Sequence, residues 1–448
     1  MSGLACAYAL RKSGIDARVV EASDHPGGII RSPRRDGYLL ELGPQSFSAT
    51  GPLLELCREL GVEDELVEAP SKAPRFLVID GKLREAPLSP PAFFTSPLFG
   101  AKTKWSILRD ALGRSVPPAD DESIGAFVRR KFSPELLEKL VGPFISGIYA
   151  GDPERLSARA AFPQLYQAEL NSGSIVRGMI RFAKSKNEPR QRPKLCSFRE
   201  GNETLVRALA NNLGGNFRCG VEVTAIQQGG AGTGPLGERF VLDARTPDGL
   251  ETIVADHLVI AAPTNIAAQL LKNIDPAFSA ALNEIEYAPV AVVSLGYRKS
   301  AVNHSLDGFG FLIPRSEGLR VLGTVWNTSL FPGRAPQDYV LLTSFIGGAT
   351  DPAAAKLSAA ELVAAVHGEI APLLSIQQPP AFSHIEIYDR AIPQYNLGHN
   401  SRIASLDRTL NIHLNLRLAG NYLHGPAVSA CVEQAQRVAR ELRPRQNS

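Results

Sequence analysis

The sequence predicts a mixed α/β fold in which a discontinuous Rossmann-like domain is interrupted by an antiparallel-sheet domain and a helical domain. Helix and strand patterns typical of a parallel sheet occur in three separated blocks of the chain. Between those blocks the pattern is mostly helical from residue 95 to 195, and it alternates as in antiparallel strands from 288 to 347. We therefore expect one domain to be assembled from distant segments, with two others inserted.

The first block begins with residues 2–14, which are rich in small residues and helix formers and end on Gly14, a typical C-terminal cap. This pattern predicts a helix. The β-branched run at 17–22 predicts a short strand, and the glycine-containing stretch at 24–28 predicts a turn. The other expected elements are helices at 52–60, 203–213 and 426–442, and strands at 217–227, 252–262 and 416–419.

Composition excludes several classes of protein. Of the 448 residues, 44% are hydrophobic and 21% are charged, which is typical of a globular chain with large cores and excludes a disordered or collagen-like one. The formal net charge of +3 is too balanced for a chain whose main partner is a nucleic acid. The five cysteines, scattered without CxxC spacing, favour a reducing cytosol. The sequence has no run of about 18 apolar residues, so no membrane span is predicted.

Gly3, Glu21, Gly27 and Gly28 have the spacing of part of a dinucleotide-binding unit. In the GxGxxG fingerprint the third glycine lets helix and strand pack closely, and an acidic residue after the next strand accepts hydrogen bonds from ribose hydroxyls. Only this third glycine is present, so we expect the first strand and the two earlier glycines to precede Met1. The alternative is ordinary packing of a helix on a strand.

The segment 420–428 contains a second candidate site. Pro426 suits the first position of a helix, which would leave the amides of Ala427 and Val428 free to face an electron-rich group. A reduced flavin develops negative charge near N1 and C2=O, and a helix N-terminus stabilises such charge. An ordinary capped helix explains the same residues equally well.

A third candidate combines a glycine-containing loop with an arginine on a later strand. Gly43 permits close approach of the backbone to a ligand. Arg75 is a forked donor suited to a carboxylate, although a lone arginine on a strand is more often solvated. The chain has no HExxH, GxSxG or GxxxxGK[ST] motif, and no metal site is expected. The residues of this candidate are Gly43, Pro44, Gln45, Ser46 and Arg75.

Several longer strings lie outside these candidates. They occupy residues 144–153, 156–157, 160–163, 322–326, 330–336, 392–395 and 398–399. Together with the three candidates, these strings resemble the flavin-containing amine oxidase superfamily, and more narrowly its oxygen-dependent protoporphyrinogen oxidases. The resemblance runs nearly from end to end of the chain, and such strings are more specific than a glycine motif.

The resemblance implies a three-part enzyme with FAD as its cofactor. Relatives oxidise protoporphyrinogen IX to protoporphyrin IX through FAD, which O2 reoxidises with release of H2O2. The implied FAD-binding domain comprises residues 1–70, 196–270 and 412–448. The implied substrate-binding domain comprises 71–94 and 271–411, and the helical domain comprises 95–195.

The resemblance also implies roles for single residues. No catalytic side chain is expected, because flavin N5 accepts the hydride and the pyrrole nitrogens of the substrate assist its loss. The implied FAD contacts are Gly3, Glu21, Gly27, Gly28, Gly43, Pro44, Gln45, Ser46, Val223, Ala427 and Val428. The implied substrate contacts are Arg75, which matches a residue that pairs with a propionate, Gly147, and the apolar Leu312, Val325 and Phe345.

The chain departs from the family's pattern at three places. The missing first strand leads us to expect a start codon upstream of Met1. Gln45 stands where relatives often carry Asn or Arg, and Pro426 replaces a residue with an amide donor. Two alternatives stay open. One is oxidation of coproporphyrinogen III, whose additional propionates would need more basic groups than Arg75, and the other is a non-catalytic tetrapyrrole-binding protein.

The expected partners are a porphyrinogen and O2, with no nucleic acid. The apolar, proline-broken segment 88–110 contains Phe93, Phe94, Leu98 and Phe99 and is followed by basic residues. It predicts either peripheral contact with a membrane or a cover over the entrance to the site. A homodimer is also expected, and a cytoplasmic location that is at most peripheral at the inner face of the membrane.

Overall fold

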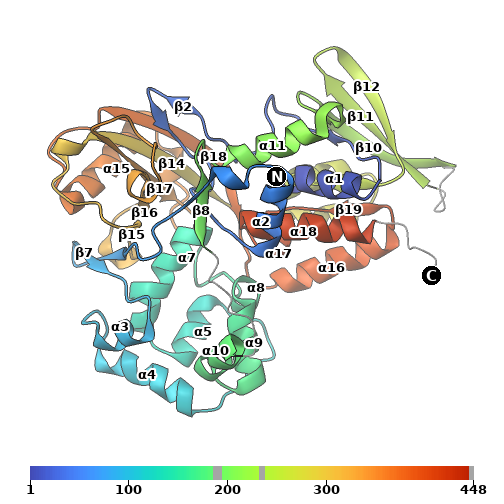
Figure 1. The fold of residues 1–448 in the computed structure, drawn as a ribbon. Helices are drawn as coiled ribbons and strands as arrows, with labels where there is room; N and C mark the ends of the chain where they lie inside the picture. The colour runs from blue at the N-terminus through green and yellow to red at the C-terminus, as the bar shows by residue number, and fades with distance from the viewer. Residues whose placement is uncertain (185–193, 232–237, 443–448) are drawn as a thin grey trace.

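The computed structural model describes residues 1–184, 194–231 and 238–442. Two bodies are visible in Figure 1. The upper body contains the sheets, the N-terminus and the last described helix, and the lower body contains the helices of residues 90–184.

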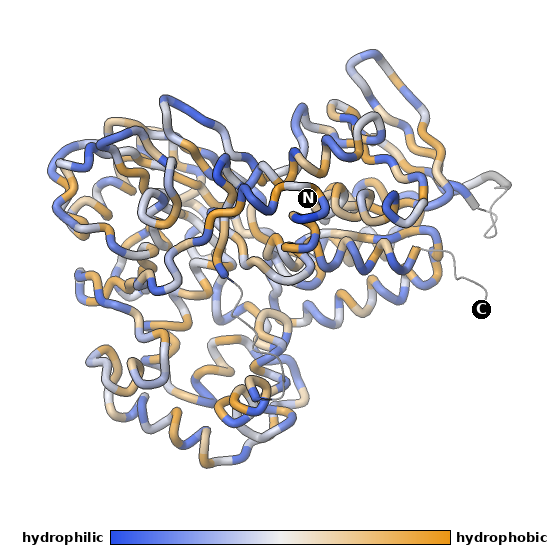
Figure 2. Tube along the Cα trace, in the orientation of Figure 1, coloured by the Kyte–Doolittle hydropathy of each residue, from blue (hydrophilic) through white to orange (hydrophobic). Residues whose placement is uncertain are grey.

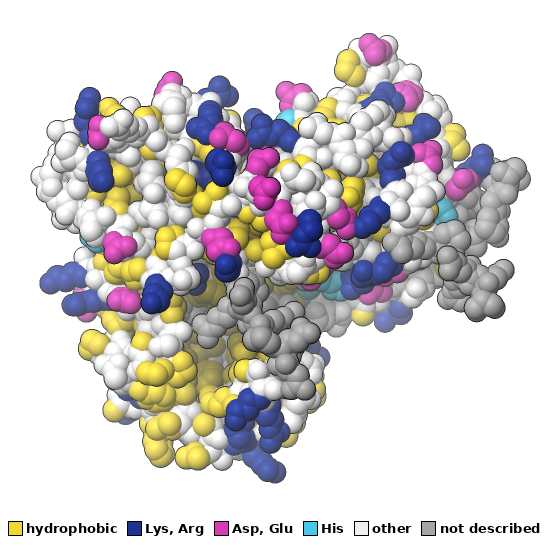
Figure 3. All heavy atoms as spheres, in the orientation of Figure 1, with side chains coloured by type: hydrophobic (Ala, Val, Ile, Leu, Met, Phe, Trp, Pro, Cys, Tyr) yellow, Lys and Arg dark blue, Asp and Glu magenta, His cyan; other side chains and the backbone are white. Residues whose placement is uncertain are grey.

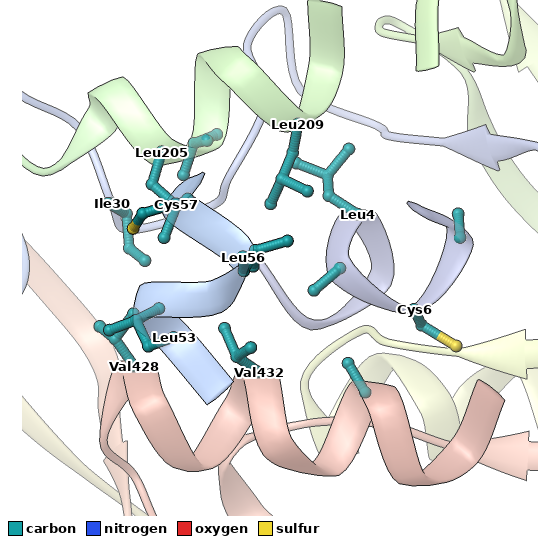
Figure 4. Close-up of a cluster of buried hydrophobic side chains, with 14 of the residues drawn as sticks. Leu4, Cys6, Ile30, Leu53, Leu56, Cys57, Leu205, Leu209, Val428 and Val432 are labelled. Atoms are coloured by element: carbon teal, nitrogen blue, oxygen red, sulfur yellow. The ribbon is translucent and has the colours of Figure 1, made fainter. Parts of the chain in front are cut away.

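One core of the upper body is built from helices that are far apart in the chain. α1 (Ser2–Lys12), α2 (Gly51–Glu59), α11 (Glu203–Leu213) and α18 (Val428–Glu441) direct leucine, valine and cysteine side chains toward one another (Figure 4). Burial of each large side chain contributes roughly 1.5–3 kcal/mol. α11 has the predicted bounds, and α1 ends before Gly14, whose φ of +80° favours glycine.

Two short parallel pairs of strands lie beside this core. β1 (Val19–Val20) pairs with β9 (Phe217–Arg218), and β13 (Leu258–Ile260) pairs with β19 (Leu416–Leu418). The parallel strands predicted for the Rossmann-like domain are therefore present as two separate pairs among the described residues. The one central strand of the expected sheet is not among these residues.

The two longest predicted strands of the Rossmann-like domain are each broken. Gly220, at a φ of +69°, ends β9, and a bend at Asp256 and His257 precedes β13. The residues on the far side of each break join a separate antiparallel sheet instead. Its strands are β10 (Glu222–Ala231), β11 (Glu238–Thr246) and β12 (Gly249–Ala255).

The largest sheet has seven strands in the order β18-β14-β17-β16-β15-β6-β7. It is mostly antiparallel, as predicted, but β6, which comes from a much earlier segment, runs parallel to β15, and β7 follows it at the edge of the sheet. α15 (Ala359–Leu374) begins with a capping box of Ser358 and Glu361 and covers one face. The strands are β6 (Arg75–Ile79), β7 (Lys82–Glu85), β14 (Tyr287–Arg298), β15 (Gly310–Leu312), β16 (Val321–Trp326), β17 (Tyr339–Gly347) and β18 (Phe382–Pro393).

The lower body is helical, as predicted, and its first helix starts at residue 90. Residues 185–193 of the predicted helical segment, and 443–448 at the C-terminus, lie outside the described residues. The helical segments are α3 (Pro90–Thr95), α4 (Ala101–Leu112), α5 (Ile124–Lys131), α6 (Pro134–Leu136), the π-helical η2 (Leu137–Val141), α7 (Gly142–Tyr149), α8 (Ala158–Ala161), α9 (Pro163–Ser172) and α10 (Ile175–Lys184).

The remaining elements connect these parts. β8 pairs with β4 and β5, and β2 pairs with β3. The strands are β2 (Arg34–Arg35), β3 (Tyr38–Leu39), β4 (Phe47–Ser48), β5 (Leu66–Glu68) and β8 (Leu195–Phe198), and the helices are α12 (Thr264–Leu271), α13 (Pro276–Asn283), α14 (Asn327–Leu330), α16 (His399–Ile412) and α17 (Asn421–His424).

The apolar surface of the helical body differs from the one predicted. Leu98 and Phe99 are buried, and the Phe99 ring stacks on Phe93 with 4.7 Å between ring centroids, so Leu98 and Phe99 do not contribute to the surface. Apolar and polar residues alternate along α4 (Figure 2), and its Trp105 and Leu112 are exposed. The surface of the lower body carries an apolar patch (Figure 3). None of the helices in the described segments is long and apolar enough to cross a membrane.

A cluster of buried charges joins α4, α5 and α9. Lys131 Nζ lies 2.5 Å from Asp110 Oδ1 and 3.3 Å from Glu169 Oε1, and Arg130 Nη1 donates to Glu169 Oε1 at 2.7 Å. Burial raises the pKa of Glu169, but hydrogen bonds from Arg130 and Ser115 and the nearby positive charges outweigh burial and lower the pKa to about 2. The cluster therefore holds Glu169 ionised inside the helical body.

We predict that Glu169→Gln lowers the free energy of unfolding by about 3 kcal/mol, because it leaves buried positive charge without its partner. The pKa of Glu169 is lowered from 4.5 on folding, so its stabilisation is present above about pH 4.5 and is lost as the pH falls toward 2. Urea unfolding at several pH values should show a steeper acid loss in the unmodified chain than in the variant. The control is Glu154→Gln, at a surface pair with Arg129, which should cost less than about 1 kcal/mol. Equal losses in both variants would contradict the prediction.

Candidate functional site

A cavity of about 2070 Å³ is lined by the large sheet, the core of α1 and α18, and α7. Every residue predicted to contact cofactor or substrate lines this one cavity, although the residues come from segments spread over the whole chain. They are Gly3, Glu21, Gly27, Gly28, Gly43, Pro44, Gln45, Ser46, Arg75, Gly147, Val223, Leu312, Val325, Phe345, Ala427 and Val428.

Arg75 begins β6 at the edge of the cavity. In the register of the sheet it lies beside Gly310, which lies beside Val325, so Arg75 and Val325 stand about 10 Å apart on one face. Its guanidinium carbon lies 5.0 Å from the centroid of the Phe309 ring, and burial lowers its pKa. The guanidinium has no hydrogen-bonded or ion-paired partner within the described ranges. Such an unpaired guanidinium is suited to bind a carboxylate.

Leu312, Gly323 and Phe345 form a second row across β15, β16 and β17. A Cβ atom at Gly323 would lie 2.8 Å from Leu312 Cδ2, and one at Gly147 of α7 would lie 2.5 Å from the same atom. The two glycines therefore let α7 and β16 approach Leu312 closely. The part of the wall formed by Leu312, Gly323, Phe345 and Gly147 is apolar and offers no side chain that could accept a proton.

The loop at Gly43 approaches a neighbouring turn very closely. A Cβ atom at Gly43 would lie 2.3 Å from the carbonyl oxygen of Ile29, so no side chain fits there. Gln45 Nε2 donates to the carbonyl oxygen of Glu41 at 2.8 Å, and Gln45 Oε1 accepts from Asn327 Nδ2 at 2.7 Å. Gln45 therefore stabilises the shape of the loop, and Gly43 allows its position.

Gly3 and Gly27 also allow close packing beside the cavity. A Cβ atom at Gly3 would lie 3.2 Å from the Cβ atom of Ala261. One at Gly27 would lie 2.5 Å from Val206 Cγ1 of α11, and Gly27 has a φ of +93°. These contacts bring the N-terminus of α1 and the turn after β1 to the same side of the cavity.

Glu21 directly follows β1, as predicted. Its Oε1 accepts hydrogen bonds from the amide of Ser23 at 3.0 Å and from the Ser23 hydroxyl at 2.9 Å. Its Oε2 has no hydrogen-bond partner in the part of the chain that the structure describes. Since Glu21 lines the cavity, this oxygen can accept a hydrogen bond from a ligand hydroxyl.

The C-terminal helix begins later than predicted. α18 starts at Val428 with Ala427 as an extended N-cap residue, so Pro426 lies outside the helix instead of at its first position. The amide of Ala427 therefore belongs to the cap, and the free amides of the first turn start at Val428. Ala427 and Val428 line the cavity, so this helix N-terminus still opens on it.

Tyr395 holds the turn that precedes α18. Its hydroxyl donates to the carbonyl oxygen of Asn421 at 2.5 Å and accepts from the amide of Gly425 at 2.6 Å. The ring stacks on His399 with 4.2 Å between centroids, and burial lowers the pKa of His399 to about 4. A neutral His399 and the paired Tyr395 hydroxyl thus fix the turn without adding charge.

The sequence analysis missed two cavity residues, Arg31 and Arg390. Neither side chain has a hydrogen-bonded or ion-paired partner among the residues that the structure describes. Arg390 lies on β18 with Glu386 and Tyr388, which also line the cavity. Because side chains two residues apart share one face of a strand, this alternation was the signal in the sequence that could have found Arg390.

The cavity also extends between the two parallel pairs of strands. Val19 and Val20 of β1 and Val259 and Ile260 of β13 all line it. β1 and β13 therefore each face the cavity, and no other strand of the described chain lies against them on that side.

The polar groups around the cavity fit a dinucleotide cofactor. Two helix N-termini, those of α1 and α18, open on it, and helix N-termini bind pyrophosphate and other electron-rich groups. Glu21 offers a free carboxylate oxygen to a ribose, and Gly43 marks a backbone that approaches its neighbours closely. Together with the apolar wall, these features define a flavoprotein oxidoreductase.

The comparison with protein families specifies the class further. The family described as flavin-containing amine oxidoreductase matches residues 1–443. The chain belongs to this family, and its cofactor is FAD.

Several relatives match nearly the whole chain. Protoporphyrinogen oxidase 1 of Arabidopsis thaliana chloroplasts is 35% identical over 473 residues, which cover 99% of this chain and 86% of the relative. Protoporphyrinogen oxidase of Bos taurus is 32% identical, covering 98% and 96%. Coproporphyrinogen III oxidase of Bacillus subtilis is 28% identical, covering 97% and 94%. A crystal structure of an Exiguobacterium protein has the same fold, with a TM-score of 0.81 and 24% identity, covering 98% and 96%.

We predict that Gly43→Ala weakens FAD binding at least about tenfold, because the new Cβ would displace the loop from Ile29 by more than a few tenths of an ångström. The control is Gly51→Ala at the start of α2, where a Cβ would meet no atom within 4 Å. Titration with FAD, followed by flavin fluorescence, measures both dissociation constants. Equal affinity in the two variants would contradict the role of close approach at Gly43.

Proposed function

We propose that this oxidoreductase converts protoporphyrinogen IX to protoporphyrin IX, with O2 reduced to H2O2. The observation that carries the proposal is the unpaired Arg75 guanidinium at the edge of an apolar wall that continues into the cofactor side of one cavity. A largely apolar macrocycle with carboxylate substituents would complement both the apolar wall and the guanidinium. The named protoporphyrinogen oxidases among the relatives support the same substrate.

We assign the cofactor to the side of the cavity formed by α1, β1, α18 and the loop at Gly43. The N-terminus of α1 at Gly3 and the turn at Gly27 and Gly28 would hold the pyrophosphate, and Glu21 would hold a ribose hydroxyl. The N-terminus of α18 would stabilise negative charge on the flavin ring. The remaining residues assigned to FAD are Gly43, Pro44, Gln45, Ser46, Val223, Ala427 and Val428.

We assign the substrate to the face of the large sheet. Arg75 would bind a propionate through its two forked N–H groups. Leu312, Val325 and Phe345 would contact the macrocycle, and Gly147 would let α7 approach it. Because this wall excludes water and carries no charge of its own, it would orient the ring by apolar contact and leave the carboxylate to fix its rotation.

The chemistry needs little from the side chains themselves. FAD, when bound, accepts hydride from a carbon of the porphyrinogen and passes the electrons to O2. Leu312, Val325, Phe345 and Gly147 neither donate nor accept protons, so the pyrrole N–H protons would leave to solvent or to the Glu386 carboxylate, which also lines the cavity. The task of the protein is to position the substrate carbon and to exclude water from the apolar side.

The test of the proposal is aerobic turnover of protoporphyrinogen IX by the FAD-loaded chain, followed by porphyrin fluorescence. Fluorescence that rises with time and is accompanied by H2O2 supports the proposal. A chain that binds FAD but leaves the porphyrinogen unoxidised rejects it, and tight porphyrin binding by a colourless chain would favour the non-catalytic alternative.

We predict that Arg75→Met raises the KM for protoporphyrinogen IX about 30-fold with little change in kcat, since a lost charged hydrogen bond costs about 2 kcal/mol in both ground and transition states. Arg75→Lys should lie between, because lysine keeps the charge and loses the fork. The matched control is Arg84→Met on β7, which is exposed and lies outside the cavity lining. Steady-state kinetics of the three variants measure the effect, and an unchanged KM in Arg75→Met would contradict it.

Coproporphyrinogen III is the second candidate substrate. Arg31 and Arg390 line the cavity in addition to Arg75, which provides more basic groups than the sequence analysis expected and suits additional propionates. The Bacillus subtilis relative carries the name coproporphyrinogen III oxidase. The ratio of kcat/KM for the two porphyrinogens decides between them, and Arg390→Met should lower only the value for coproporphyrinogen III.

We further propose the three-part division set out from the sequence, with residues 71–94 and 271–411 as the substrate-binding domain. The entry of β6 and β7 into the same sheet as β14–β18 supports the joining of these two segments, whereas α3 (Pro90–Thr95) lies with the helical body. A homodimer stays a prediction, which sedimentation velocity measures. The cytoplasmic location also stays a prediction, supported by the free state of all five cysteines.

Peripheral membrane contact would use the exposed face of α4. Trp105, Leu108 and Leu112 lie on one side of this helix and are 61%, 43% and 79% exposed. Lys102 and Lys104 lie beside them and would face anionic headgroups.

We predict that the double variant Trp105→Ser/Leu112→Ser binds anionic vesicles about 30-fold more weakly, because two apolar side chains together lose roughly 2 kcal/mol of transfer free energy. The control is Leu250→Ser, which removes an 85% exposed leucine from β12 in the upper body. Flotation with phosphatidylglycerol vesicles measures the bound fraction. Absence of flotation by the unmodified chain would rule out membrane contact.

A further inference from the structure

The loop at Gly43 is tied to a buried ion pair between residues far apart in the chain. Arg334 Nη1 lies 3.2 Å from Glu41 Oε1, and the two side chains are 1% and 2% exposed. Arg334 belongs to the string at 330–336, to which the proposed function assigns no role. Both charged groups are thus removed from water, and Glu41 lies two residues before Gly43 in the chain.

Each partner of this ion pair makes further hydrogen bonds. Glu41 Oε2 accepts from the Ser32 hydroxyl at 2.6 Å, and Glu41 Oε1 accepts from the amide of Asn202 at 3.0 Å. Arg334 Nη2 donates to the Ser197 hydroxyl at 2.6 Å and to the carbonyl oxygen of Phe198 at 3.1 Å. The pair therefore joins the chain after the turn at Gly28, the strand β8 and the segment after α14.

The same network reaches the cofactor-facing loop directly. Asn202 Nδ2 donates to the carbonyl oxygen of Pro44 at 2.6 Å, and the Ser197 hydroxyl donates to Asn202 Oδ1 at 2.8 Å. Gln45 Nε2 donates to the carbonyl oxygen of Glu41. The loop thus has its backbone held from one side by Asn202 and from the other by its own Gln45.

There is little room for this network to shift. Gly201 has a φ of +89°, and a Cβ atom there would lie 2.2 Å from Ser32 Cβ and 3.2 Å from Glu41 Oε1. The backbone next to Asn202 is therefore packed directly on the ion pair, and a movement of Glu41 would move Asn202 and Pro44 with it.

Burial of this ion pair costs desolvation free energy, which lowers its net contribution to the stability of the fold. Burial raises the pKa of Glu41 to about 7, against the opposing effects of Arg334 and of the hydrogen bonds from Ser32, Asn202 and Ser197. Burial also lowers the pKa of Arg334. Apolar residues would stabilise such a position as well or better, so the pair contributes geometry more than stability.

We propose that Arg334, acting through Glu41 and Asn202, is a positioning residue that holds the segment Gly43, Pro44, Gln45 and Ser46 in place for the cofactor. This inference rests on the proposed assignment of that segment to FAD. It gives the string at 330–336 a role, and it makes the geometry of the cofactor side depend on a residue more than 280 positions later in the chain.

The test compares Arg334→Met, the double variant Glu41→Gln/Arg334→Met and a control, Arg177→Met. Arg177 also donates to several carbonyl oxygens, those of Ala111, Gly113 and Ser172, but it lies in the helical body outside the cavity lining. Three quantities are measured on the full chain: the melting temperature, hydrogen exchange of the backbone amides from 42 to 47, and the dissociation constant of FAD at a temperature where each variant is folded.

We expect Arg334→Met to raise the exchange rates of these amides and the dissociation constant of FAD about tenfold or more. Arg177→Met should lower the melting temperature with less than about a threefold change in either quantity. The double variant leaves no unpaired buried charge, so its melting temperature should recover while exchange and FAD affinity stay impaired. If Arg334→Met does not fold, the double variant supplies the same comparison.

The inference is overturned if Arg334→Met and Arg177→Met affect exchange and FAD affinity equally, or if the double variant recovers all three quantities together. A failure of the proposed function would look different. In that case the unmodified chain would bind FAD and leave porphyrinogen unoxidised, while the differences in exchange between the variants would persist.

Discussion

Among the described residues the two faces of the seven-stranded sheet are covered differently, and α7 meets the cavity face at Leu312. α15 packs on one side, and the other side carries Arg75, Leu312, Val325 and Phe345 into the cavity. Apolar side chains on an open sheet face gain stability when something excludes water from them. A flat apolar ligand supplies that cover when bound, so the architecture of the sheet and the chemistry of the proposed substrate meet the same physical requirement.

The positively charged side chains of this molecule have different surroundings in the cavity and in the helical body. The net charge of the chain is small, yet the cavity contains arginines without partners among the described residues, whereas the helical body pairs Lys131 and Arg130 with buried carboxylates. An unpaired cation next to a cavity can bind an incoming anion without first breaking an ion pair. A paired and buried one contributes instead to how neighbouring helices are placed. Arginines of the cavity are thus available to bind an anion, whereas buried and paired ones position neighbouring segments.

Local patterns predicted many elements because neighbouring residues decide them. α11 has its predicted bounds, since apolar spacing and a C-terminal glycine act within one helix. The strands at 217–227 and 252–262 were predicted too long, because β-branched runs do not reveal that their two halves pair with different sheets. The start of α18 was misplaced by two residues, because the hydrogen bonds of Tyr395 around Gly425 come from another part of the chain.

The sequence by itself indicated the type of cofactor and the mostly helical pattern predicted from about residue 95 to 195, because these follow from composition, short-range spacing and family resemblance. Tertiary structure decided the rest. It placed Arg75 two strands from Val325, opened Arg390 onto the cavity and joined Arg334 to Glu41. Each of these relations depends on strand register or on contacts between distant segments, and such contacts leave no periodic signal in the chain.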